Sequence, residues 1–224
     1  MLGVIAGLMM MQPHLSGTIL IMLIGLTLVF VGGAKLTHLG GAGLAGCALL
    51  IAVILLKKNY FMTRITTWLD PFNEATSAGD TWQTCQSLIA IGSGGLFGLG
   101  FCESRQKYLY LPETKNDFVF AIVCEELGLV GACVVMLVFA LLILRGFWIA
   151  LHARDRFGAL LVVGFMTLTS LQTFLNIAVV TGLVPATGIS LPFFSYGGTA
   201  LLCQLAEMGI VLSVSRQMPA PQNG

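Results

Sequence analysis

The sequence contains very few charged residues. Charged side chains make up 9% of its 224 residues, whereas a soluble domain carries roughly 25%. A chain with so little charge cannot cover a water-facing surface, which excludes an ordinary soluble domain. The net charge of +1 gives no sign of a nucleic-acid partner either.

Motifs for metal binding and for common soluble-enzyme chemistry are also missing. The six cysteines include no CxxC pair, and most lie in apolar runs, which favours small buried side chains. The histidines at 14, 38 and 152 are far apart in the sequence, which argues against a metal site built from them. No Walker loop, zinc motif or Ser/His/Asp set appears, and the apolar start lacks the basic region of a cleavable signal peptide.

Hydrophobic runs dominate what is present. Hydrophobic residues make up 57% of the chain, and the mean hydropathy is +0.92. A helix needs about 20 apolar residues to cross a membrane. We therefore predict an all-α, polytopic bundle of transmembrane helices in which residues 1–224 form one integral membrane domain. The predicted spans are 15–34, 39–56, 118–144, 158–180 and 194–214, with a partial span at 1–11 before them.

Two predicted loops differ from the rest of the chain. The loop 57–118 holds six of the eleven basic and six of the ten acidic residues. Loops of this length are usually functional or disordered, and the aromatic residues in this one favour order. Its apolar, glycine-rich stretch 87–101 is too short to cross a membrane, so we predict a half-helix that ends in a glycine turn. The second unusual loop, 181–193, is rich in proline and glycine.

The short loop 145–157 sets the predicted orientation. It carries three arginines and one acid, and basic short loops are typical of the cytoplasmic side. Alternation of the spans then places the C-terminus in the cytoplasm and both unusual loops on the extracytoplasmic face. We therefore expect a functional site on that outer face.

Asp117 is the leading candidate for chemistry. It directly precedes a predicted membrane helix, where partial desolvation raises the pKa of a carboxylate and suits it to act as a general base. Glu113 lies four residues earlier and could take part in the same site. The alternative is an ordinary solvated acid that the helix dipole stabilises at the start of the helix.

Three further acids fall inside predicted spans. Glu125 and Glu126 lie in the first turns of one span, and Glu207 lies in the last. Acids within a membrane are costly and usually mark function. Snorkelling to the surface or an ion pair with the outer loop is the alternative.

Basic and neutral residues extend the candidate site. Arg64 and Lys107 could bind an anionic group, although a structural salt bridge for Arg64 and contact with anionic headgroups for Lys107 stay open. Gln86 could hydrogen-bond a sugar. The turn containing Ser195, Gly197 and Gly198 opens a helix, so its N–H groups could meet either a sugar or a phosphate. A purely structural helix start is the alternative.

Three stretches together resemble the SEDS family (shape, elongation, division and sporulation), which comprises the FtsW/RodA/SpoVE proteins. They are WLDPF with TWQTCQSLIAIGSGGLFGLG (68–100), SRQKYLYLPETKNDFVFAIVCEELGLVG (104–131) and NIAVVTGLVPATGISLPFFSYGGTAL (176–201). The resemblance covers essentially the whole chain in the family's order. The sequences SRQKYLYLPE and GSGGLFGLG most resemble those of the Gram-positive division and sporulation branch.

The resemblance implies an enzyme of the bacterial plasma membrane, a peptidoglycan glycosyltransferase that polymerises lipid II into glycan strands. The process served is division, elongation or sporulation. The implied partners are a class B penicillin-binding protein, which is the transpeptidase, and other divisome, elongasome or sporulation membrane proteins. A divalent cation, Mg²⁺ or Mn²⁺, is implied without identified ligands. The family's essential acid falls in a PExxxDF context, which is Asp117 here, and the implied role is general base.

The sequence departs from the family in its extent. Family members have about ten spans, so this chain corresponds to their C-terminal half, and we expect activity to depend on the other half. At the residue level, His14 stands where many members have an acid. Two other functions stay open, namely a lipid II flippase that uses the acids within the spans and a non-catalytic scaffold for the transpeptidase.

Overall fold

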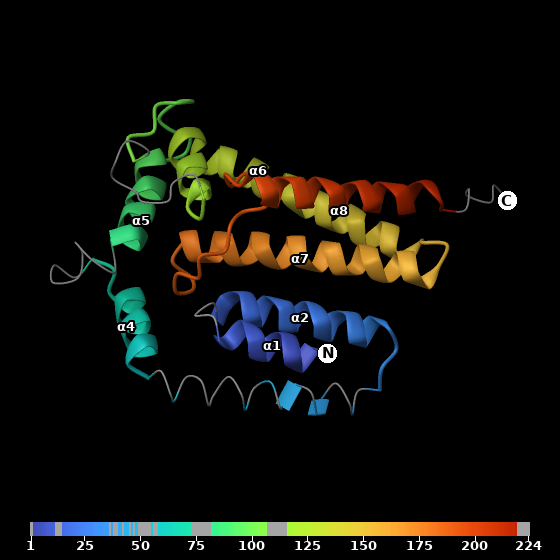
Figure 1. The fold of residues 1–224 in the computed structure, drawn as a ribbon. Helices are drawn as coiled ribbons and strands as arrows, with labels where there is room; N and C mark the ends of the chain where they lie inside the picture. The colour runs from blue at the N-terminus through green and yellow to red at the C-terminus, as the bar shows by residue number, and fades with distance from the viewer. Residues whose placement is uncertain are drawn as a thin grey trace. The chain divides into compact units, whose positions relative to one another are not determined.

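The computed structural model describes residues 2–11, 15–35, 58–72, 82–106 and 116–218, with isolated positions between 37 and 55. The regular structure of these residues is entirely helical, which confirms the predicted all-α class (Figure 1). The helices are α1 (Leu2–Met11), α2 (Leu15–Val31), α4 (Lys58–Leu69), α5 (Trp82–Gly94), α6 (Val119–Leu151), α7 (Arg156–Val180) and α8 (Gly198–Arg216).

The chain forms two compact units. The first comprises Met1–Leu50, Phe139–Leu171 and Gly198–Gly224, and the second Ile51–Val138 and Gln172–Gly197.

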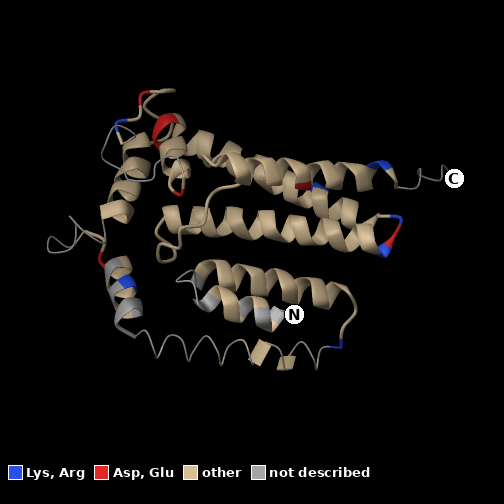
Figure 2. Ribbon diagram, viewed as in Figure 1, with Lys and Arg blue, Asp and Glu red and all other residues tan. Residues whose placement is uncertain are grey.

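Among the residues that the structure describes, three helices, α6, α7 and α8, are long and apolar enough to cross a membrane. They correspond to the predicted spans 118–144, 158–180 and 194–214. Figure 2 shows that they carry few charged residues. α6 continues to Leu151, beyond the predicted end, and its 33 residues would measure about 50 Å as one straight helix. This exceeds the ~30 Å hydrocarbon core of a bilayer, so part of α6 must lie outside it, be tilted or be bent.

The N-terminal apolar segments are shorter than these helices. α2 has 17 residues and ends at Val31 rather than 34, because a turn follows in which Gly33 adopts φ +89°. α1 covers the partial span predicted at 1–11 and packs against α2. The predicted span 39–56 lies largely outside the described residues.

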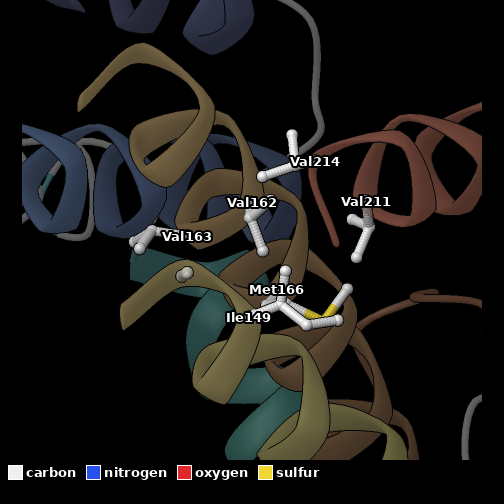
Figure 3. Packing of buried hydrophobic residues seen from close by; sticks show 7 residues of the cluster. Ile149, Val162, Val163, Met166, Val211 and Val214 are labelled. Atoms are coloured by element: carbon white, nitrogen blue, oxygen red, sulfur yellow. The ribbon is translucent and has the colours of Figure 1, made fainter. Parts of the chain in front are cut away.

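The first unit is held together by a hydrophobic cluster from three helices. Figure 3 shows Ile149 of α6 and Met166 of α7 among the side chains of this cluster. Gly146 permits close packing, because a Cβ at that position would overlap Met166. The carboxylate of Asp155 accepts a hydrogen bond from the Gly158 N–H at 2.7 Å and caps the start of α7. The cluster comprises Ile149, Ala150, Val162, Val163, Met166, Val211 and Val214.

In the second unit, a glycine turn inserts into a break in α6. Gly128 adopts φ 67° and ψ −169°, which interrupts the helix. The break interrupts the backbone hydrogen bonds of α6, and the turn 95–100 after α5 pairs with four of the backbone groups on its two sides. The bonds are Leu99 N to Glu125 O (3.0 Å), Gly100 N to Glu126 O (3.1 Å), Leu129 N to Gly95 O (2.9 Å) and Val130 N to Leu96 O (3.2 Å). The predicted short helix with a glycine turn is therefore confirmed, and this pairing satisfies backbone groups on both sides of the break.

Candidate functional site

Asp117 lies in the turn that leads into α6, and a buried amide fixes its backbone. Asn176, in the last turn of α7, donates hydrogen bonds from Nδ2 to the carbonyl oxygens of Asp117 and Ile189, both at 2.7 Å. Asn176 is 1% exposed, so these bonds form away from water. One side chain thus ties the Asp117 turn to the loop 181–193.

Ser195 holds the neighbouring residue in the same way. Its hydroxyl donates to the carbonyl oxygen of Asn116 at 2.5 Å and accepts from the Leu191 N–H at 2.7 Å. The Ser195 N–H also donates to the Leu191 carbonyl at 3.1 Å, which closes the turn 191–195. Because this turn is a separate structure, α8 begins at Gly198 and not at the predicted residue 194.

A glycine borders the Asp117 carboxylate. Gly188 has φ +68°, and a Cβ built there would lie 3.6 Å from Asp117 Oδ2. Residue 188 therefore places no side chain against the half-buried Asp117. A carboxylate with a firmly held backbone is suited to accept a proton from a bound hydroxyl.

The helix α4 reaches the same loop. Arg64 Nη1 donates to the Ala186 carbonyl at 2.6 Å, and the Trp68 indole N–H donates to the Gly182 carbonyl at 2.7 Å. The Arg64 side chain is exposed. The loop 181–193 therefore contacts both Arg64 and the turn that bears Asp117, so two of the predicted site residues border one loop.

Other predicted residues lie in structural settings. Gln86 is buried in α5, and its neighbour Ser87 donates to the Val180 carbonyl at 2.9 Å. Glu125 is buried at 1% exposure and accepts hydrogen bonds from residues 104–106. Glu126 is half-buried, and its carbonyl pairs with Gly100.

The remaining predicted residues are not part of this group in the described structure. Glu207 of α8 is half-buried in the first unit, where it lines a mainly apolar cavity of about 430 Å³. Gly197 precedes α8, and Gly198 is its first residue. Lys107 and Glu113 lie outside the described residues. Within the described ranges, no group of three or more His, Cys, Asp or Glu residues could hold a metal ion.

Sequence reasoning assigned no role to Asn176 or Gly188. An amide inside an apolar span is a visible signal, because it needs buried partners. The partners of Asn176 could not be read from the sequence, since Asp117 lies 59 residues away. Gly188 is one of many glycines, and its place beside the Asp117 carboxylate is visible only in the structure.

Comparison with known proteins gives one consistent family. The FtsW/RodA/SpoVE model, described as cell cycle protein, matches residues 1–219. Stage V sporulation protein E of Bacillus subtilis (strain 168) is 43% identical over 210 residues, which are 93% of this chain and 56% of the relative. A protein named probable peptidoglycan glycosyltransferase FtsW, from Geobacter sp. (strain M18), is 39% identical over 97% of this chain and 58% of its own.

Solved structures agree with these relatives. A structure described as "Structural coordination of polymerization and crosslinking by a peptidoglycan synthase complex" matches with a TM-score of 0.74 and 32% identity, covering 98% of this chain and 60% of that one. The rod shape determining protein RodA of Thermus thermophilus matches with a TM-score of 0.59 and 29% identity, over 96% of this chain and 54% of its own. The chain thus spans a little over half the length of the proteins that it matches.

Proposed function

Since this chain belongs to the FtsW/RodA/SpoVE family, we propose that it forms the catalytic part of a peptidoglycan glycosyltransferase that polymerises lipid II in division, elongation or sporulation. Several relatives are named as probable peptidoglycan glycosyltransferases. The observation that carries the proposal is the half-buried Asp117 at the start of a membrane helix, with its backbone held by Asn176 and the adjacent carbonyl held by Ser195.

In the proposed mechanism, Asp117 is the general base. It takes the proton from the acceptor sugar hydroxyl while that oxygen attacks the anomeric carbon of the donor lipid II. The new glycosidic bond forms as the bond from the anomeric carbon to the pyrophosphate oxygen breaks, and undecaprenyl pyrophosphate leaves with the electron pair. Arg64, which is exposed and bound to the same loop, offsets the charge on the leaving group.

A divalent cation, Mg²⁺ or Mn²⁺, is part of the proposal through the family resemblance. The described residues do not form a protein cage for it. Mg²⁺ is commonly held by one or two carboxylates together with substrate phosphates, so its chemistry here would be to neutralise the pyrophosphate. The roles proposed for Asp117 and Arg64 do not depend on it, and chelation with EDTA tests the requirement directly.

The membrane location, the orientation and the partners are part of the same proposal. The chain is a membrane protein. We place it in the bacterial plasma membrane as a multi-pass protein, with the loops 57–118 and 181–193 extracytoplasmic and the C-terminus cytoplasmic. The likeness to a peptidoglycan synthase complex supports a class B penicillin-binding protein as partner, alongside other divisome, elongasome or sporulation membrane proteins.

The test is polymerisation of purified lipid II. The chain would be assayed alone, and then after co-production with the N-terminal part of the Bacillus subtilis relative, in each case with a class B penicillin-binding protein and Mg²⁺. We expect glycan strands on a gel when both parts are present. If no strands form in any combination although the parts assemble, the proposal is wrong.

Glu207 supports a second candidate, a lipid II flippase. This acid lies on α8, which is long and apolar enough to span a membrane, and it lines a mainly apolar cavity. Acids within a membrane often mark transport pathways. Glu207→Gln separates the two functions, because a flippase should lose lipid II translocation into vesicles. A polymerase with its base at Asp117 should keep its rate of strand formation.

A further inference from the structure

Arg145 is a charged side chain on an exposed face of α6, a helix that is long and apolar enough to cross a membrane. Leu141, four residues before it, and Trp148, three residues after it, lie on the same face and are also exposed. A charge on a membrane helix is costly unless it pairs or reaches the headgroup region. Arg145 lies six residues before the end of α6, which is about 9 Å along the helix axis, so its long side chain can extend to the headgroups.

The protein supplies Arg145 with an aromatic ring in place of an acid. The Cζ atom of Arg145 lies 4.1 Å from the centroid of the Trp148 ring. His152 stacks on the same ring with centroids 4.3 Å apart, and its Nδ1–H donates to the Trp148 carbonyl at 2.9 Å. Within the described part of the chain, no carboxylate or carbonyl oxygen binds the Arg145 guanidinium. The ring therefore holds the guanidinium and leaves its N–H donors for an anion.

The acids of the same compact unit do not supply that anion. The sequence of the first unit contains five basic residues against two acids. The basic residues are Lys35, Arg145, Arg154, Arg156 and Arg216, and the acids are Asp155 and Glu207. The Asp155 carboxylate accepts the N–H of Gly158 at 2.7 Å, and Glu207 lines the apolar cavity of this unit. Neither acid forms an ion pair with Arg145 in the described structure.

Other arginines gather at this end of the unit. Arg154 and Arg156 lie in and beside the turn between α6 and α7, and Arg216 ends α8; all three are exposed. A Cβ built on Gly158 would lie 3.4 Å from Val214, so the end of α8 lies against the start of α7. Figure 2 shows basic residues at the turn and at the end of α8. Arg145 thus lies next to a group of positive charges, beside a tryptophan of the kind that marks the headgroup level.

We propose that Arg145, held on Trp148, binds the phosphate group of an anionic phospholipid in the leaflet around this end of α6. A guanidinium can donate two parallel N–H bonds to phosphate oxygens, and lipid phosphate is the anion that a bilayer provides at the end of a membrane helix. Zwitterionic lipids carry the same phosphate together with a cationic group, which the neighbouring arginines repel. The site therefore prefers a headgroup with net negative charge, such as phosphatidylglycerol. It does not depend on the proposed catalytic activity.

The fluorescence of Trp148 reports on this site directly. The other two tryptophans, Trp68 and Trp82, would be changed to Phe, and the full chain reconstituted in vesicles of phosphatidylcholine. Quenching by brominated phosphatidylglycerol would be compared with quenching by brominated phosphatidylcholine. One basic residue near an anionic surface is worth about 1 kcal/mol, so we expect Arg145→Gln to lower the preference for phosphatidylglycerol about fivefold. The matched control is Lys35→Gln, which removes one charge from an exposed residue of the same unit and should keep the preference.

Three outcomes of this experiment would overturn the proposal. They are equal quenching of the unchanged site by the two lipids, equal losses in Arg145→Gln and Lys35→Gln, and displacement of the brominated lipid by excess inorganic phosphate. The last outcome would indicate a site for free phosphate. Retention of the lipid in excess phosphate supports a lipid headgroup as the ligand.

A second measurement needs no change of the other tryptophans. It applies if the chain with both Phe substitutions fails to fold, since the Trp68 indole binds the Gly182 carbonyl. Native mass spectrometry of the otherwise unaltered chain in detergent would then count retained lipid. We expect phosphatidylglycerol to be retained over phosphatidylethanolamine, with about fivefold less retained by Arg145→Gln and part of the loss restored in Arg145→Lys. Unchanged retention by Arg145→Gln would refute the site.

Discussion

Asp117 owes its position to neighbouring groups that act on the backbone. Asn176 and Ser195 bind the carbonyl oxygens of residues 117 and 116 and leave the carboxylate itself for other contacts. Breaking such buried bonds leaves unsatisfied carbonyls, at a cost of about 1–3 kcal/mol each. Asp117 is therefore held by its main chain, and Gly188 places no side chain against its carboxylate.

Gly188 provides a test at this scale. A methyl group in Gly188→Ala would contact the Asp117 carboxylate and obstruct an approaching hydroxyl, so we expect at least a tenfold lower polymerisation rate. The control is Gly182→Ala in the same loop, where φ is +74° and a Cβ would meet Leu88 instead. Both changes should cost about 1 kcal/mol or more in unfolding free energy because of their positive φ. Equal losses of activity in the two variants would show that the contact with Asp117 does not matter.

At the scale of elements, α6 consists of two helical pieces that meet at Gly128. The turn 95–100, from another part of the chain, hydrogen-bonds to both pieces. The apolar run from residue 118 predicted the helix well, because hydrophobicity and length are sufficient signals for a membrane span. The break at Gly128 could not be predicted in the same way. A lone glycine is common in membrane helices, and the turn 95–100 that completes the break lies about thirty residues earlier.

The contact between α5 and α6 can be tested with two glycines of one helix. A Cβ at Gly94 would overlap the carbonyl oxygen of Cys124, whereas a Cβ at Gly92 would meet nothing within 4 Å. We expect Gly94→Ala to lower the unfolding free energy by about 1–3 kcal/mol through overpacking. Gly92→Ala should be neutral or stabilise by up to about 1 kcal/mol, since alanine favours a helix. Thermal unfolding in detergent measures both, and similar values would contradict this packing.

At the scale of the whole molecule, the sequence predicted the class of protein better than its site. Low charge and long apolar runs predicted a helical membrane protein, and the motif strings predicted the family. The grouping of Asp117, Asn176 and Arg64 around the loop 181–193 depends on contacts between residues far apart in sequence. Such contacts leave little trace in local composition. The expected importance of Ser195 came from its turn, yet its hydroxyl binds backbone groups at Asn116 and Leu191.

The orientation of the protein yields a prediction of its own. Cys102 is exposed in the loop predicted to be outside, and Arg154 is exposed in the loop predicted to be inside, at the far end of α6. With Cys102 as the sole cysteine, a membrane-impermeant maleimide should label intact spheroplasts. A cysteine-free chain with Arg154→Cys should be labelled only after permeabilisation. Labelling of both from the same side, or the reverse pattern, would refute the predicted orientation.

The measurement that tests the central claim most directly is the rate of lipid II polymerisation by Asp117→Asn, at an amount of folded protein equal to that of the unchanged chain. The amide keeps the size of the side chain but cannot accept the proton, so we expect the rate to fall by about 10²–10⁴-fold. Asp117→Glu, which retains a carboxylate, should keep more activity than the amide. Polymerisation by Asp117→Asn at the unchanged rate would contradict the account, because the reaction would then need no base at this position.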